Sequence, residues 1–136
     1  MALAGYSGSP LEKKLGFKEG FVIRLQGQPD YYFSLFHSLP DNLVFTQDIH
    51  TLKNCIHVFF TEGSKFYDSI DALKAEIVPN GMIWVSWPKK TSKVSTDITE
   101  DYIRDLALKR GLVDVKVCAV DEVWSGLKLV IPLKYR

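Results

Sequence analysis

The segment that decides the fold runs from Cys55 to Trp87 and reads CIHVFFTEGSKFYDSIDALKAEIVPNGMIWVSW. Residues 55–61 are nearly all apolar and partly β-branched, which predicts a strand covered on both faces. Next come apolar residues at offsets of four, three and four, which share one side of a helix: Phe66, Ile70, Leu73 and Ile77. Residues 78–81, VPNG, predict the end of that helix, and residues 82–87 predict a second buried strand. This order indicates parallel strands joined by a crossover helix.

The same alternation extends toward both ends of the chain. Before Cys55 we expect a short helix capped by Ser9, a strand, a brief helix and a short strand, at residues 9–16, 21–26, 30–39 and 43–46. After Trp87 we expect a helix near 98–110 and two strands, 113–120 and 127–133, which six residues join into an antiparallel hairpin. The sequence therefore predicts an α/β fold: a mostly parallel sheet of about six strands, helices on both faces, and a C-terminal antiparallel hairpin.

The composition indicates one globular domain. The 136 residues suit a single core, so we assign residues 1–136 to one domain and expect residues 1–8 to form a mobile arm. The formal charge of +1 predicts neither a nucleic-acid partner nor a membrane partner. The N-terminus lacks a secretory signal, and Cys55 and Cys118 lie in apolar runs that suit a reducing compartment. We expect a cytoplasmic protein, whose oligomeric state the sequence does not indicate.

Two stretches carry a resemblance to a known fold. LKAEIVPNGMIWVSW, residues 73–87, and LALKRGLVDVKV, residues 106–117, are similar to the later helix, turn and strand units of class I S-adenosylmethionine-dependent methyltransferases, which have a Rossmann-like fold. The predicted hairpin completes that layout. The whole chain also resembles an uncharacterised family of small bacterial proteins, a domain of unknown function, through four motifs: SGSPLEKKLGFKEG, WVSWPKK, TDITED and KVCAVDEVWSGLKLV. That family implies no activity.

The chain departs from the methyltransferase pattern where the cofactor would bind. The first strand of that fold leads into a glycine-rich loop, because glycines let the backbone approach the cofactor. The matching residues here, RLQGQPDYY at 24–32, contain only Gly27. Asp48 lies near the position of the acid that would hold ribose hydroxyls, and one strand and helix are missing between residues 48 and 55. We therefore expect no bound cofactor.

Residues 87–101, WPKKTSKVSTDITED, supply the main candidate site. They leave the carboxyl end of a predicted strand, where ligands of open parallel sheets usually bind. Their lysines and the start of the next helix suit an anion, and Asp97 or Thr99 is expected to cap that helix. The alternative is a solvated loop whose lysines face water. The candidate ligand-binding residues of this segment are Trp87, Lys89, Lys90, Lys93, Thr96 and Asp97.

The predicted hairpin loop adds Asp121 and Trp124 to the candidates. Asp121 and Glu122 are adjacent, so their side chains point to opposite faces of a strand and suit an acid–base pair poorly. Trp124 either packs over the sheet edge or forms an aromatic lid over a ligand.

Cys55 and His57 share one face of a predicted strand, but no second pair of ligands has the spacing of a metal site. The sequence predicts no metal and a core histidine with satisfied hydrogen bonds.

These features favour a noncatalytic or regulatory module that binds a small anionic ligand or a protein partner through residues 87–97 and the hairpin. The first alternative is a small enzyme that acts on an anionic metabolite, in which Lys89 or Lys90 stabilises negative charge and Asp97 or Asp121 transfers a proton. The second alternative is an S-adenosylmethionine-dependent methyltransferase.

Overall fold

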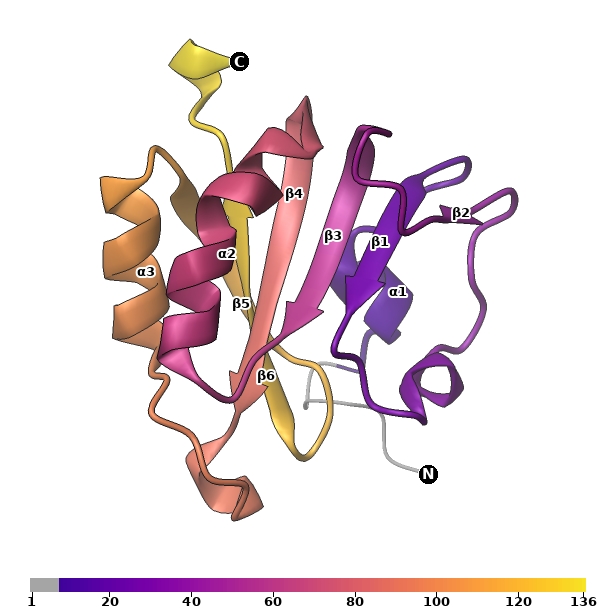
Figure 1. Ribbon diagram of the computed structural model, residues 1–136. Coiled ribbons are helices and arrows are strands. Elements are labelled where there is room, and N and C mark those ends of the chain that lie inside the picture. The colour runs from indigo at the N-terminus through magenta and orange to yellow at the C-terminus, as the bar shows by residue number, and fades with distance from the viewer. Residues whose placement is uncertain (1–7) are drawn as a thin grey trace.

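Six strands form one sheet in the order β2-β1-β3-β4-β6-β5 in the computed structural model, which describes residues 8–136 (Figure 1). Strands β1 to β4 run parallel to one another, and β6 lies antiparallel between β4 and β5. The strands are β1 (Val22–Gln26), β2 (Val44–Phe45), β3 (Lys53–Phe59), β4 (Ile77–Pro88), β5 (Val113–Ala119) and β6 (Trp124–Val130). The predicted α/β architecture and its terminal hairpin are confirmed. The predicted arm at residues 1–8 falls almost entirely outside the described residues.

Two α-helices cover one face of the sheet, α2 (Gly63–Ala75) and α3 (Glu100–Lys109) (Figure 1). The predicted stripe of α2 is buried there, with Phe66, Ile70 and Leu73 packed against apolar residues of β3 and β4. The helix α3 begins at its cap, Thr99, whose side chain accepts a hydrogen bond from the backbone N–H of Tyr102. Burial of this apolar face, more than local helix propensity, stabilises both helices.

The opposite face carries a second core under shorter elements. The helix α1 (Leu11–Leu15) and the single 3₁₀ turn η1 (Tyr32–Leu35) pack on β1, β3 and β4. The indole Nε1 of Trp84 donates a hydrogen bond to the backbone oxygen of Leu15 over 2.9 Å, which fixes α1 over β4. Helical elements thus lie on both faces, as predicted. Two further 3₁₀ turns are η2 (Lys90–Ser92) and η3 (Leu133–Tyr135).

Two local predictions are wrong. Residues 78–81 do not separate helix from strand, because β4 begins at Ile77 and pairs with Lys53 of β3 before the register shifts. Ser9 does not cap α1, whose cap residue is Pro10. The carboxylate of Glu12 accepts hydrogen bonds from the backbone N–H groups of residues 37 and 38. In both cases long-range pairing replaces the local motif.

Within residues 8–136, no helix has the length and apolar character needed to cross a membrane.

Candidate functional site

The carboxyl ends of β1, β3 and β4 meet at one edge of the sheet, together with the turn between β5 and β6 (Figure 1, lower edge). At this edge the chain leaves β4 and forms a loop that leads to α3. A cavity of about 970 Å³ opens along the loop and is lined by residues 87–90, 93–101 and Ser125. The sequence-based proposal of a ligand site on this segment therefore has a matching cavity.

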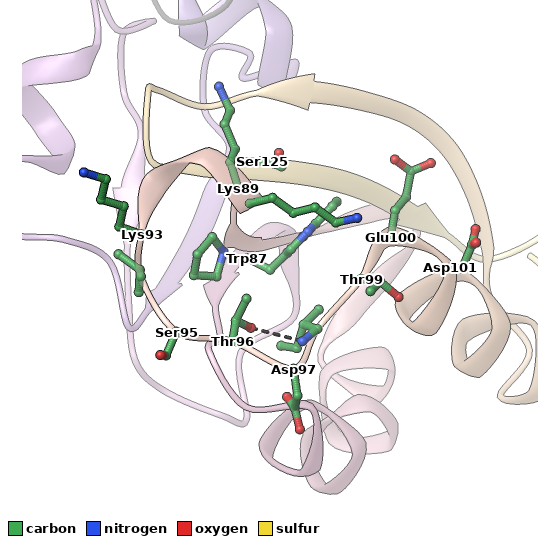
Figure 2. A pocket seen from close by; sticks show the side chains of 14 residues that line it. Trp87, Lys89, Lys93, Ser95, Thr96, Asp97, Thr99, Glu100, Asp101 and Ser125 are labelled. Atoms are coloured by element: carbon green, nitrogen blue, oxygen red, sulfur yellow. Dashed lines mark hydrogen bonds between the residues drawn. The ribbon is translucent and has the colours of Figure 1, made fainter.

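Three of the predicted residues bring positive charge to the cavity: Lys89, Lys90 and Lys93. None of them forms an ion pair within residues 8–136. In Figure 2 the side chains of Lys89 and Lys93 extend in different directions, so their ammonium groups do not converge on one point. The cavity thus carries three positive charges that do not converge, and it is open to solvent.

Trp87 forms the apolar base of the cavity. Its side chain is 7% exposed and belongs to the core under α2 and α3. Because the indole is fixed by this packing, it offers a rigid apolar edge to the cavity rather than a movable lid.

Asp97 and Thr96 join the loop to α2 instead of to α3. The carboxylate of Asp97 accepts a hydrogen bond from the backbone N–H of Gly63, the first residue of α2, over 2.7 Å. The hydroxyl of Thr96 donates to the backbone oxygen of Thr61 over 2.6 Å. Asp97 therefore stabilises the positive end of a helix that begins 34 residues earlier. Of the two caps expected for α3, Thr99 is the one observed.

The other end of the loop is held by the hairpin. The backbone N–H of Lys89 donates to the oxygen of Val123 over 2.7 Å. The hydroxyl of Ser92 donates to the backbone oxygen of Lys89, and Lys93 has a left-handed backbone with φ of 67°. A non-glycine residue adopts that conformation only where its surroundings favour it. The loop is therefore tethered at both ends, which fixes the mouth of the cavity.

Asp121 and Trp124, the two remaining predicted residues, do not line this cavity. The carboxylate of Asp121 accepts hydrogen bonds from the backbone N–H groups of Val123 and Trp124, which closes the turn. The ring of Trp124 packs edge-on against Phe59 at 5.1 Å, on the α1 side of the sheet. Side chains alternate along a strand, so Ser125 faces the cavity while its neighbour Trp124 faces away.

Tyr31, which the sequence did not single out, approaches Asp121. Partial burial and a hydrogen bond with the Asp121 carboxylate raise the pKa of the Tyr31 hydroxyl to about 12. The phenol is therefore a hydrogen-bond donor at neutral pH, and it links the segment after β1 to the hairpin turn.

Ser125, Thr99, Glu100 and Asp101 line the cavity but were not predicted as ligand residues. Ser125 reaches the cavity because β6 pairs with β4, where it lies opposite Trp87. The residues around Ser125 do not indicate which strand β6 will pair with, so its place in the cavity could not be predicted from the sequence. The acids Glu100 and Asp101 both form ion pairs with Arg104 of α3, so they are partly neutralised.

The strand order reverses at β1, because β2 lies on one side of β1 and β3 lies on the other. In folds of this kind, dinucleotides and related cofactors bind at the carboxyl ends of the strands at this point. Here the two strand ends touch, because a Cβ atom built on Gly27 would lie 2.7 Å from the backbone oxygen of Phe59. The segment after β1 forms only the single turn η1, and not a longer helix whose N-terminus faces the crevice. Asp48 uses its carboxylate oxygens to bind the backbone N–H of His50 and the hydroxyl of Thr51. The described residues at this point contain no glycine-rich loop, and the carboxylate of Asp48 already accepts two hydrogen bonds, so they do not support a site for S-adenosylmethionine.

We expect Gly27→Ala to lower the free energy of unfolding by about 2–4 kcal/mol, because the new methyl group meets backbone and the residue has a left-handed φ. The φ of Gly27 is 71°. Gly20 is the matched control, since its φ is 77° but no atom lies within 4 Å of its added Cβ. Gly20→Ala should cost about 1 kcal/mol from backbone strain alone. Equal losses in urea denaturation would show that the contact with Phe59 is not tight.

His57 is a core residue with both ring nitrogens bonded. Its Nδ1 lies 2.9 Å from the hydroxyl of Tyr32, and its Nε2 lies 2.8 Å from the hydroxyl of Ser86. Burial lowers the pKa of the imidazole to about 3 and raises the pKa of the neighbouring Cys55 thiol above its usual range. The prediction of a satisfied core histidine is confirmed. No group of three or more potential metal ligands occurs in residues 8–136.

Comparison with known proteins finds similarity of fold without similarity of sequence. No protein-family model matches the chain, and no curated protein matches it in sequence. The resemblance to a small bacterial family therefore stays a prediction.

Several solved structures have the same architecture. The ribosomal protein L11 methylase from Lactobacillus delbrueckii subsp. bulgaricus matches with a TM-score of 0.58 and 9% identity, over 89% of this chain and 74% of that chain. A SAM-dependent methyltransferase from Aquifex aeolicus has a TM-score of 0.56 and 13% identity, over 89% and 88% of the two chains. Magnesium protoporphyrin IX methyltransferase from Synechocystis PCC 6803, with bound SAH, has a TM-score of 0.55 and 11% identity, over 83% and 74%.

At these identities the likeness concerns the fold alone. The chain has the Rossmann-like α/β fold of the class I S-adenosylmethionine-dependent methyltransferases.

Proposed function

We propose that the chain binds a small anionic ligand in the cavity at the carboxyl end of β4 and acts as a binding module rather than as an enzyme. The observation that carries this proposal is the set of three lysines along a cavity of about 970 Å³, without an ion-pair partner in the described residues. A cavity of this size holds a metabolite, and several ammonium groups attract an anion.

The carboxylates around the cavity support binding over proton transfer. Asp97 is hydrogen-bonded to the start of α2, and Asp121 is hydrogen-bonded within the hairpin turn. Glu100 and Asp101 pair with Arg104. A general acid or base must reach a bound substrate to transfer a proton. Each of these carboxylates is instead bonded to a backbone N–H group or to Arg104. We also propose that the protein is bacterial and is located in the cytoplasm.

The proposal predicts that Lys89→Ala with Lys90→Ala weakens anion binding at least tenfold, which corresponds to about 1.4 kcal/mol. A thermal-shift screen of anionic metabolites on the wild type supplies the probe, because a ligand that binds the folded state raises the melting temperature. The best compound is then titrated into both proteins. Lys13→Ala with Lys109→Ala is the control, since both lysines are exposed, belong to neither proposed anion site and remove the same charge.

Two results contradict the proposal. One is a screen in which no anionic compound raises the melting temperature. The other is a compound that binds the Lys89/Lys90 double variant as tightly as the wild type.

A second candidate function is methyl transfer from S-adenosylmethionine, which the shared fold favours. The contact between Gly27 and Phe59 and the engaged carboxylate of Asp48 argue against it. We expect calorimetric titration of S-adenosylmethionine to give no binding in the micromolar range. A micromolar dissociation constant would make the methyltransferase the better proposal, and Gly27→Ala would then be tested for loss of that binding.

A further inference from the structure

The outer strands of the sheet carry a pair of lysines directly opposite each other. Lys116 of β5 and Lys128 of β6 are register partners in the antiparallel hairpin. Partners in such a pair project to the same face with their Cβ atoms roughly 5 Å apart, and like charges there destabilise the pairing. The repulsion between these two ammonium groups therefore weakens the pairing of β5 with β6.

Both lysines lie on the α1 side of the sheet. The neighbours of Lys128 in sequence, Leu127 and Leu129, belong to the core under α2 and α3, so Lys128 projects to the other face. Lys128 is also the register partner of Trp84, which α1 covers. Lys116 confirms this placement, because its ammonium group donates to the backbone oxygen of Lys14 in α1. The row Trp84, Lys128, Lys116 therefore runs outward from beneath α1 to the sheet edge.

The helix α1, whose residue Lys14 accepts the hydrogen bond from Lys116, has only five residues. On the hairpin, the residues that share this face include no carboxylate: Trp124, Gly126, Lys128, Val130, Val113, Lys116 and Cys118. Asp114, the nearest acid on β5, instead pairs with Arg104 of α3 on the opposite face. Within residues 8–136, neither Lys116 nor Lys128 forms an ion pair.

Further cations surround the pair. The pKa of Lys128 lies below its usual value, first because the side chain is half-buried and then because the charges of Lys116, Lys18 and Arg136 are close. Three other cations thus act on Lys128, although the whole chain has a formal charge of only +1. We call these four residues, Lys18, Lys116, Lys128 and Arg136, the hairpin basic patch.

We propose that the hairpin basic patch is a second anion site, distinct from the cavity at the end of β4, and that it binds a small ligand with several closely spaced negative charges, such as a short phosphate chain. Such a ligand places negative charge between Lys116 and Lys128 and so removes their repulsion. A ligand with one negative charge neutralises only part of the patch. The near-neutral chain as a whole does not favour a long polyanion such as nucleic acid.

The test uses inorganic tripolyphosphate as the probe and thermal unfolding as the readout. We expect tripolyphosphate to raise the melting temperature of the wild type, while sodium chloride at the same ionic strength does not. Lys116→Gln with Lys128→Gln should weaken the apparent affinity at least about tenfold. Without any anion, this variant should melt at or above the wild-type temperature, because the repulsion is gone. The single variants Lys116→Gln and Lys128→Gln give the same comparison if the double variant does not fold.

The variant Lys89→Ala with Lys90→Ala separates this site from the proposed function. It should keep the full response to tripolyphosphate. A response that is lost in the Lys89/Lys90 variant and kept in the Lys116/Lys128 variant would overturn the second site while leaving the cavity intact. An equal response to matched sodium chloride, or binding of a short DNA duplex without binding of tripolyphosphate, would also overturn it.

Discussion

Replacing Glu76 by Gln is expected to lower the free energy of unfolding by about 3–5 kcal/mol, because it leaves two buried cations without their counter-charge. The carboxylate of Glu76 accepts hydrogen bonds from Nε and Nη2 of Arg24 over 3.0 and 3.1 Å. It also lies 2.8 Å from the ammonium group of Lys53, whose side chain is fully buried. One carboxylate at the end of α2 thus pairs with two cations, one from β1 and one from β3.

Asp71→Asn provides the control for that experiment. Asp71 pairs with Arg110, also between a carboxylate and a guanidinium, but the Asp71 side chain is 71% exposed. Exposed pairs contribute little, since water solvates both partners after the pair is broken. Chemical denaturation of the two variants should therefore show a several-fold larger loss for Glu76→Gln. Comparable losses would mean that water reaches Arg24 and Lys53 and that the cluster does not hold the strands together.

Acidification is expected to destabilise the protein through His57. In the folded protein burial lowers the pKa of the imidazole to about 3, from an ordinary value of 6.5. Between these two values the unfolded chain binds a proton that the folded chain does not. The contribution of His57 to stability is therefore complete above pH 6.5 and decreases as the pH falls, by about 1.4 kcal/mol per pH unit.

The measurement is the free energy of unfolding between about pH 7 and about pH 5 for the wild type and for His57→Gln. The variant is expected to be less stable at neutral pH, because the bonds to Tyr32 and Ser86 are altered, but its stability should fall less steeply with acid. His50→Gln is the control, since His50 is exposed, and it should keep the wild-type slope. If His57→Gln and the wild type show parallel pH profiles, the imidazole is not buried in its neutral form.

Most of the element order could be predicted from the sequence, because periodicity is a local signal. The continuous apolar run around Ile56 predicted β3, and the stripe of Phe66, Ile70 and Leu73 predicted α2. Six residues between two alternating runs predicted the antiparallel hairpin. These patterns report which side of each element meets the core, and burial of that side is what stabilises the element.

The candidate site was predicted in part for a similar reason. Residues that follow a parallel strand gather at the carboxyl edge of the sheet, so Lys89, Lys90 and Lys93 were expected beside a cavity, and they line one. The partners of the individual side chains were not predicted. Asp97 caps α2 and not α3, and Ser125 enters the cavity from β6 while its neighbour Trp124 faces the other side of the sheet.

The sequence by itself determined the α/β class, the succession of strands and helices, and the loop that carries the lysines. Only the tertiary structure decided that Gly27 touches Phe59, that Glu76 pairs with Arg24 and Lys53, and that Lys116 lies opposite Lys128. These pairs are separated by 12 to 52 positions in the chain, and each depends on strand register and on which face a side chain takes. Register is set by the packing of all six strands together, so no local stretch of residues encodes it.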